Sequence, residues 1–163
     1  MMKIRIFLFA PLMALLLAMV GGTRADAEME GPVDFSLEKL GGGTVSVADY
    51  RGQWLVVNYW ATWCAPCIKE MPELSALHNG RDDTAVLGLA YEEVDDATLL
   101  AFLDEIDVDF PILKVDVYNP PQPFGTPMVL PTTYVVNPEG MPVKTFRGPV
   151  TREDIKHVIE DQI

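Results

Sequence analysis

Hydrophobic and polar residues follow one another along the chain in blocks that predict alternating strands and helices. The nearly unbroken apolar run 54–60 predicts a strand buried on both faces, and apolar residues at three- and four-residue spacing over 65–79 predict a helix directly after it. A second strand is predicted over 84–91, a second helix beginning at 95–96, and a short strand over 110–113. The second helix has an apolar face formed by Leu99, Phe102, Leu103 and Ile106.

Glycine and proline mark the turns between these elements. Gly41-Gly42-Gly43 separates two short apolar stretches and predicts an N-terminal β-hairpin within 33–47. The turn sequence Asn137-Pro138-Glu139-Gly140 predicts a second, antiparallel hairpin over 132–147. Five prolines among the fourteen residues of 118–131 exclude regular helix there and predict an extended surface loop.

A final helix closes the chain. Thr151 and Asp154 have the spacing of a capping box, which marks the start of this helix. Its apolar face is predicted to consist of Ile155, Val158, Ile159 and Ile163. The order strand, helix, strand, helix, hairpin, helix predicts a single α/β domain with a mixed central sheet flanked by helices.

Composition excludes several classes of protein. Hydrophobic residues make up 49% of the 163 positions, too many for a disordered chain, and two cysteines are too few for a disulfide-stapled miniprotein. Twelve Lys and Arg against 24 Asp and Glu give a net charge of -12. This charge disfavours nucleic acid and acidic membrane surfaces as partners.

The first 27 residues resemble an export signal. Lys3 and Arg5 precede the apolar stretch 6–20, and Ala25-Asp26-Ala27 supplies a small-residue cleavage site. We expect cleavage there, which leaves a domain of residues 28–163; the alternative is an uncleaved membrane anchor. In either case the domain lies outside the cytoplasm, in the periplasm, where cysteine pairs tend to oxidise.

Both cysteines fall in one motif, Trp63-Cys64-Ala65-Pro66-Cys67, between a predicted buried strand and a predicted helix. Unpaired N–H groups and the macrodipole at a helix N-terminus stabilise an anion, so Cys64 is expected to ionise more readily than a free thiol. Cys67, three positions later, can then attack the mixed disulfide that Cys64 forms. The motif predicts a redox pair with Cys64 as nucleophile and Cys67 as resolving thiol.

Other roles for two cysteines fit less well. A structural disulfide would close only a tiny loop and would constrain the unfolded chain little. Zinc would need two more ligands, but His78 and His157 lack a ligand spacing, and covalent haem would need His where Ile68 stands. We therefore expect no metal site and no cofactor, and we expect both histidines at the surface.

Several motifs together resemble a known family. These are the run 58–67 (NYWATWCAPC), Glu70-Met71-Pro72, Leu130-Pro131-Thr132-Thr133, and Asn137-Pro138-Glu139-Gly140. In order and spacing they are similar to thioredoxin-like thiol-disulfide oxidoreductases of the TlpA/ResA/DsbE group. The resemblance implies a thioredoxin-like fold with an N-terminal β-hairpin and a central insertion, here around 92–113.

The resemblance also implies roles for individual residues. It makes Leu130-Pro131 a cis-proline segment facing the cysteines, with the Leu130 backbone pairing with an extended substrate strand. It places the Glu70 carboxylate near the disulfide, where it relays the proton of Cys67. It also assigns Trp63 to shielding the thiolate and contacting partners.

The residues alone favour plainer interpretations of the same positions. Pro131 would begin an ordinary strand, Glu70 would be an exposed helix carboxylate, and Trp60 and Trp63 would pack in the core. The acidic stretch 91–93 would be a solvated loop.

The function that the resemblance implies is disulfide reduction outside the cytoplasm. Its partners would be exported cysteine-containing proteins, such as apocytochrome c or a copper-site assembly protein, and a membrane thiol electron donor. We expect a monomer. An oxidase would differ only in reduction potential, a peroxidase would use Cys64 as the peroxidatic thiolate, and a non-catalytic module would only bind apoproteins. The stretch 118–127 departs from the family pattern, so partners transfer less safely than chemistry.

Overall fold

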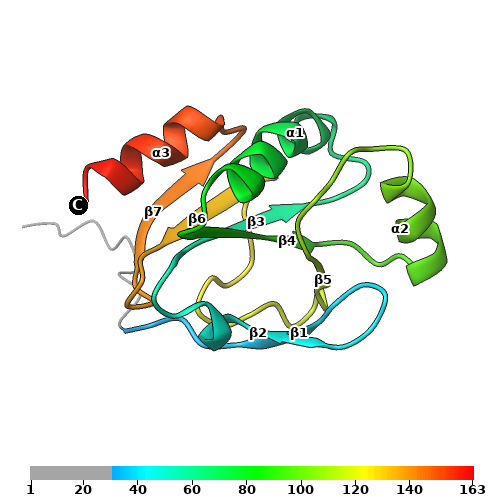
Figure 1. Ribbon diagram of the computed structural model, residues 1–163. Coiled ribbons are helices and arrows are strands. Elements are labelled where there is room, and N and C mark those ends of the chain that lie inside the picture. Colours follow the sequence, from blue (N-terminus) through cyan, green and yellow to red (C-terminus); the bar gives the residue numbers. More distant parts are fainter. Residues whose placement is uncertain (1–30) are drawn as a thin grey trace, which may run out of the picture.

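The computed structural model describes residues 31–163, and the predicted export signal lies outside this range. Within these residues, two sheets and three α-helices make up the fold (Figure 1). The elements in chain order are β1 (Ser36–Glu38), β2 (Thr44–Ser46), the 3-10 helix η1 (Val47–Tyr50), β3 (Trp54–Trp60), α1 (Ala65–Gly80), β4 (Thr84–Ala90), α2 (Asp96–Leu103), β5 (Ile112–Lys114), β6 (Thr132–Val136), β7 (Pro142–Arg147) and α3 (Arg152–Glu160).

The main sheet has the strand order β5-β4-β3-β6-β7. β3, β4 and β5 run parallel, whereas β6 is antiparallel to β3 and β7 is antiparallel to β6. A parallel pair needs a crossover connection, which α1 supplies between β3 and β4. As a result, the segments that follow β3 and β4 begin at the same edge of the sheet.

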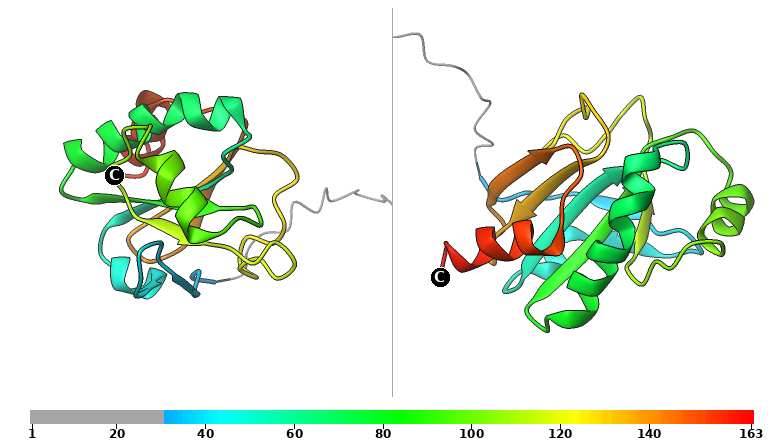
Figure 2. Two further views of the ribbon diagram at one scale, coloured as in Figure 1. Left: turned by 90° about the vertical axis from the view of Figure 1, so that its right-hand side faces the viewer. Right: turned by 90° about the horizontal axis from the view of Figure 1, so that it is seen from above.

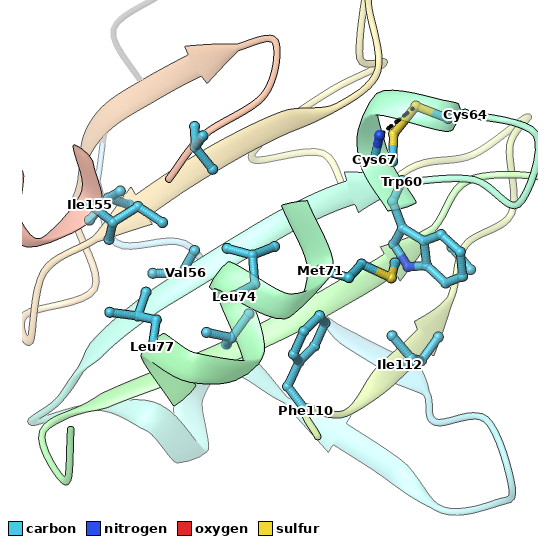
Figure 3. Close-up of a cluster of buried hydrophobic side chains, with 14 of the residues drawn as sticks. Val56, Trp60, Cys64, Cys67, Met71, Leu74, Leu77, Phe110, Ile112 and Ile155 are labelled. Carbon is cyan, nitrogen blue, oxygen red and sulfur yellow. Dashed lines mark hydrogen bonds between the residues drawn. A yellow bond between two sulfur atoms is a disulfide. The ribbon is translucent and has the colours of Figure 1, made fainter. Parts of the chain in front are cut away.

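Helices and hairpin cover opposite faces of this sheet. α1 and α3 lie over one face, and the β1-β2 hairpin lies against the other (Figures 1 and 2). Alternate residues of the strands therefore enter two separate hydrophobic clusters: Val56 and Trp60 pack beneath α1, whereas Leu55 and Tyr59 face the hairpin. Figure 3 shows the α1 side, where Met71 and Leu74 meet the sheet.

The predicted elements are confirmed in type and order. β3 and the β6-β7 hairpin have the predicted bounds, and the capping box of Thr151 and Asp154 is present at the start of α3. The mixed sheet flanked by helices and the N-terminal hairpin agree with the expected fold. α2 and β5 form the central insertion between β4 and β6.

Two details of the prediction were wrong. Ile163 is 90% exposed because α3 ends at Glu160, before the residue could join the apolar face. The segment 118–131 does lack regular helix, but it is only partly a surface loop. Phe124 is buried within it and stacks on Tyr134, with ring centroids 4.2 Å apart. The loop thereby covers the hairpin side of the sheet.

No helix within residues 31–163 is long and apolar enough to span a bilayer.

Candidate active site

The two cysteines are joined in a disulfide at the start of α1 (Figure 3). Cys64 is the N-cap residue, and its Sγ accepts a hydrogen bond from the N–H of Cys67 at 3.4 Å. Pro66 in the first turn fits this position, because the backbone donors of the first turn have no partner inside the helix. The first cysteine thus lies where a helix N-terminus stabilises a thiolate.

The disulfide is largely enclosed, but its two ends differ. Cys64 is 4% exposed and Cys67 is completely buried, so the pair is slightly more open at Cys64. Trp63, directly before Cys64, is 70% exposed, and the expectation that it packs in the core was wrong. Trp60 does pack in the core, where it stacks on Phe102. Its place on the α1 face of β3 explains the difference.

Glu70 is buried one turn beyond Cys67, with 3% of its surface exposed. Its Oε1 accepts a hydrogen bond from Asn58 Nδ2 at 2.7 Å, and its Oε2 accepts one from the N–H of Val150 at 2.8 Å. Burial raises the pKa of Glu70 from 4.5 to about 7, although both hydrogen bonds oppose the shift. The exposed carboxylate expected from the residues alone was therefore wrong.

Sequence reasoning missed the partners of this carboxyl group. Asn58 lies on the α1 face of β3 and also donates from Nδ2 to Thr133 Oγ1, at 2.9 Å. The register of β3 and β6 sets Asn58 opposite Thr133. We call Glu70, Asn58, Thr133 and the N–H of Val150 the Glu70 cluster. Its signal in the sequence is an asparagine inside an apolar strand, since a buried amide requires a partner.

A second carboxylate, that of Glu92, binds the segment just N-terminal to Cys64. Glu92, just beyond the end of β4, accepts from the N–H of Thr62 at 2.7 Å and from the Thr62 hydroxyl at 2.9 Å. These contacts form because β3 and β4 end at the same edge of the sheet. The expectation of a merely solvated acidic loop was wrong for Glu92, which fixes the residue two positions before Cys64.

The peptide bond between Leu130 and Pro131 is cis, as the resemblance implied. Leu130 is half-buried and packs against the cluster that contains both cysteines. Pro131 is buried, and its carbonyl accepts from the N–H of Gly148 at 2.9 Å. Leu130 also packs against the cluster on the hairpin side, so the segment contacts both clusters and lies directly before β6 rather than within it.

The histidines differ from one another. His157 is exposed, as expected. His78 is half-buried at the end of α1, and its Nδ1 accepts from the N–H of Val86 at 3.1 Å, so the expectation of a simple surface position was wrong. Burial lowers the pKa of His78, against an opposing effect of Asp109. Within residues 31–163, no group of three or more His, Cys, Asp and Glu residues is arranged to hold a metal ion.

Residues 30–141, which include the disulfide and both glutamates, match the AhpC/TSA family. The chain belongs to this family. Thioredoxin-like protein YneN of Bacillus subtilis is 32% identical over 130 residues, covering 78% of this chain and 75% of that protein. Thiol-disulfide oxidoreductase ResA of Halalkalibacterium halodurans is 30% identical over 132 residues, covering 80% of this chain and 74% of that protein.

A solved structure is also similar to this chain. The secreted thiol-disulfide isomerase of Corynebacterium glutamicum has 27% sequence identity and a TM-score of 0.67, over 77% of this chain and 80% of that one. The fold is thioredoxin-like, and the resemblance to the TlpA/ResA/DsbE group is confirmed. The protein is a thiol-disulfide oxidoreductase with Cys64 and Cys67 as its cysteine pair.

Proposed function

We propose that the protein is an extracytoplasmic disulfide reductase that acts on exported proteins, with Cys64 as nucleophile and Cys67 as resolving thiol. The observation that carries this proposal is the asymmetry of the pair. Cys64 caps α1 and is the more exposed residue of the pair, whereas Cys67 is fully buried three residues before the buried Glu70. An oxidoreductase that works in this order needs one sulfur to meet the client and one to finish the exchange.

The exchange transfers two electrons from the dithiol to the client. The Cys64 thiolate attacks one sulfur of the client disulfide, so that an S–S bond forms to Cys64 and the other client sulfur leaves as a thiolate. The Cys67 thiolate then attacks Cys64 Sγ and releases the second client thiolate. The client becomes a dithiol, the protein becomes the disulfide described above, and an external thiol donor reduces it again.

Glu70 supplies a place for the proton that Cys67 loses. Cys67 is buried, so its thiol cannot release a proton directly to bulk water. The carboxyl group of Glu70, whose pKa is raised to about 7, takes up and gives back a proton near neutral pH. In this role Glu70 is a proton relay between Cys67 and the solvent or the departing client thiolate.

Trp63, Leu130 and Pro131 are the residues proposed to bind the client. Trp63 offers an exposed aromatic surface beside Cys64, and Leu130 packs against the cluster that contains the disulfide. The backbone of Leu130 would pair with an extended client strand, while Pro131 contributes no N–H donor. Met128 and Val129 are both exposed and connect this segment to the stretch 118–127, which departs from the family pattern. Their side chains would add to client selection.

Export is part of the proposal. The signal-like residues 1–27 and the separate domain 28–163 support it, and so does the similarity to a protein described as secreted. The electron donor would be a thiol protein of the membrane. The clients would be exported cysteine-containing proteins, with apocytochrome c or a copper-site assembly protein as candidates, and the reductase would work as a monomer.

Trapping the mixed disulfide tests the order of attack. A Cys67→Ala variant should accumulate a covalent complex with a client through Cys64, because the resolving sulfur is absent. A Cys64→Ser variant should form no such complex, and its reduction of insulin disulfides should fall to the uncatalysed rate. Non-reducing electrophoresis and mass spectrometry of the linked peptides read both results. Trapping through Cys67 in a Cys64→Ala variant instead would overturn the assignment.

The reduction potential and peroxide turnover separate the alternatives. Proteins with this chemistry span about -270 to -120 mV, and a reductase should lie toward the lower end. A potential near the upper end would make the protein an oxidase. Peroxide consumption faster than insulin reduction would make it a peroxidase, and full biological activity of Cys64→Ser would make it a non-catalytic binding module.

A further inference from the structure

The side-chain amide of Asn58 is completely buried, but only half of it is paired. Nδ2 donates both of its protons, one to Glu70 Oε1 at 2.7 Å and the other to Thr133 Oγ1 at 2.9 Å. Oδ1 has no hydrogen-bond partner in the part of the chain that the structure describes. Buried polar atoms are nearly always paired, so an unpaired oxygen beside a titratable carboxyl group requires an explanation.

The explanation lies in the two ends of the amide. As a carboxylate, Glu70 can only accept hydrogen bonds, and Nδ2 is the end of Asn58 that suits it. As a carboxylic acid, Glu70 carries a proton on one oxygen and must donate it. The end of Asn58 that can accept that proton is Oδ1, which reaches the same place when the amide turns by half a rotation.

We propose that Asn58 is a positioning residue for the proton of Glu70, donating to the carboxylate through Nδ2 and, after the amide turns over, accepting from the acid through Oδ1. This inference rests on the proposed function, because it concerns the proton that Cys67 exchanges during reduction. It assigns the buried asparagine of β3 a part in the redox cycle rather than a purely structural one.

The rest of the Glu70 cluster fits both states. The N–H of Val150 donates to Glu70 Oε2, and this oxygen can accept whether or not the other oxygen is protonated. The Thr133 hydroxyl accepts from Nδ2 in the first state and can donate to Oδ1 in the second. The amide can therefore turn over while its two hydrogen bonds, to Glu70 and Thr133, and the bond from the Val150 N–H to Glu70 are all kept.

The side of the Asn58 amide that lacks a hydrogen-bond partner makes the two orientations of the amide differ in energy. In the observed orientation it holds Oδ1, an unpaired acceptor; after the turn it would hold an NH₂ group with two unpaired donors. Asn58 therefore favours the carboxylate over the acid and lowers the pKa of Glu70, against the larger effect of burial. Removing the amide should raise the pKa of Glu70 further.

Charged groups around Glu70 do not account for its titration. Tyr59 and Tyr134, the tyrosines of β3 and β6, face the hairpin side of the sheet. The charged residues of α3 are at the surface or half-buried, and no Lys, Arg or His in residues 31–163 forms an ion pair with Glu70. On α1 itself, Lys69 and Glu73 are exposed, and Glu73 accepts from the N–H of Arg152. Cys64 and Cys67, the buried cysteines of this helix start, carry no proton as a disulfide.

The test follows the two side chains directly by NMR of the oxidised protein. We expect the Glu70 carboxyl carbon and the Asn58 side-chain amide resonances to titrate with one shared midpoint. In Glu70→Gln the added amide can donate to Oδ1 as the acid does, so the Asn58 resonances should match those of the wild type at low pH. Asn58 resonances that stay constant while Glu70 titrates would overturn the proposal.

A variant without the amide gives the second readout. Asn58→Leu should raise the midpoint of the Glu70 titration by about one pH unit, the effect of losing a hydrogen bond to a charged group. Ser75→Ala is the matched control, since Ser75 is buried on the same helix but bonds to 107 and 109 instead of Glu70. An unchanged Glu70 midpoint in Asn58→Leu would contradict the proposal.

The shorter variant Asn58→Ser provides the same readout if the leucine variant does not fold. Both measurements use the oxidised protein and need no client, donor or turnover. The inference about Asn58 can therefore fail while the reductase assignment stands. Conversely, a failure to trap clients through Cys64 would sink the proposed function without changing how Glu70 and Asn58 titrate.

Discussion

Two glutamates hold the segment that carries the disulfide, and they do so in contrasting ways. Glu70 is buried on α1 and accepts from Asn58 and from the N–H of Val150. Glu92 follows β4, is half-buried, and accepts from the N–H and hydroxyl of Thr62. Each carboxylate therefore has two short hydrogen bonds, and the main difference between the two is access to water.

This difference in access to water suits the two carboxylates to different tasks. Glu70 is suited to exchange a proton, whereas Glu92 is suited to hold the loop before Cys64 in place. Desolvation penalises the charged form of a buried carboxyl group and brings the pKa of Glu70 to about 7, where a proton can move in either direction at neutral pH. Glu92 is only half-buried, and both of its oxygens bond to Thr62, so its hydrogen bonds serve geometry. The comparison teaches that two hydrogen bonds do not by themselves define the role of a carboxylate near a thiol.

The largest expected effect is the contribution of Glu70 to the pH dependence of the free energy of unfolding. Its pKa is about 7 in the folded state and 4.5 ordinarily, so between these values the folded state binds more protons than the unfolded state. Glu70 therefore contributes stability that is fully present below pH 4.5 and is lost as the pH rises through 7. The loss amounts to roughly 3 kcal/mol.

Urea unfolding of the oxidised protein at a series of pH values measures this contribution. The difference in unfolding free energy between the wild type and Glu70→Gln should decrease from pH 4.5 to 7.5. The same difference taken with Glu105→Gln should stay flat, because Glu105 is exposed and has no side-chain hydrogen bond in the described chain. If the difference in unfolding free energy between the wild type and Glu70→Gln also stayed constant with pH, Glu70 would not titrate in this range and could not act as the proton relay.

Exchange kinetics should show the next effect. In Glu70→Gln the fold is kept but no proton can be relayed, so reduction of insulin disulfides should slow by about 10²-fold near pH 7, the lower end for general acid–base catalysis. The pH profile of the rate should lose the inflection near 7. Unchanged rates and unchanged thiol pKa values in this variant would contradict the relay.

The fold was predictable from the sequence because its signals are local. An unbroken apolar run defined β3, the turn sequence at 137–140 defined the β6-β7 hairpin, and Thr151 with Asp154 marked the start of α3. The resemblance added the cis bond before Pro131, which no local pattern of apolar residues could supply. The prediction for Ile163 was wrong because the apolar spacing of the sequence continues past Glu160, the last residue of α3.

The site was less predictable because its contacts join residues far apart in the sequence. Thr62 and Glu92 are 30 positions apart, and Val150 is 80 positions from Glu70. Only the sheet register and the packing of α1 bring these groups together. The burial of Phe124 was missed for the same reason. Its packing on the hairpin side of the sheet depends on distant residues and cannot be predicted from the proline-rich composition around it.

The smallest expected effect belongs to Glu92 and tests the other half of the comparison. Glu92→Ala removes both hydrogen bonds to Thr62, so the segment in front of Cys64 loosens and client reduction should slow by about fivefold, as expected for about 1 kcal/mol of lost positioning. Hydrogen exchange of the Thr62 amide should become faster. The pH profile of the reaction should not change.

Glu92→Gln should restore most of the rate. Its carbonyl can still accept from the Thr62 N–H, and its amide can donate to the Thr62 hydroxyl, so the geometry survives without the charge. The same replacement at Glu70 should remove the proposed proton relay, which hydrogen-bond geometry alone cannot supply. If Glu92→Gln were as slow as Glu92→Ala, or if either variant moved the pKa of the Cys64 thiol, Glu92 would act through its charge and the contrast with Glu70 would fail.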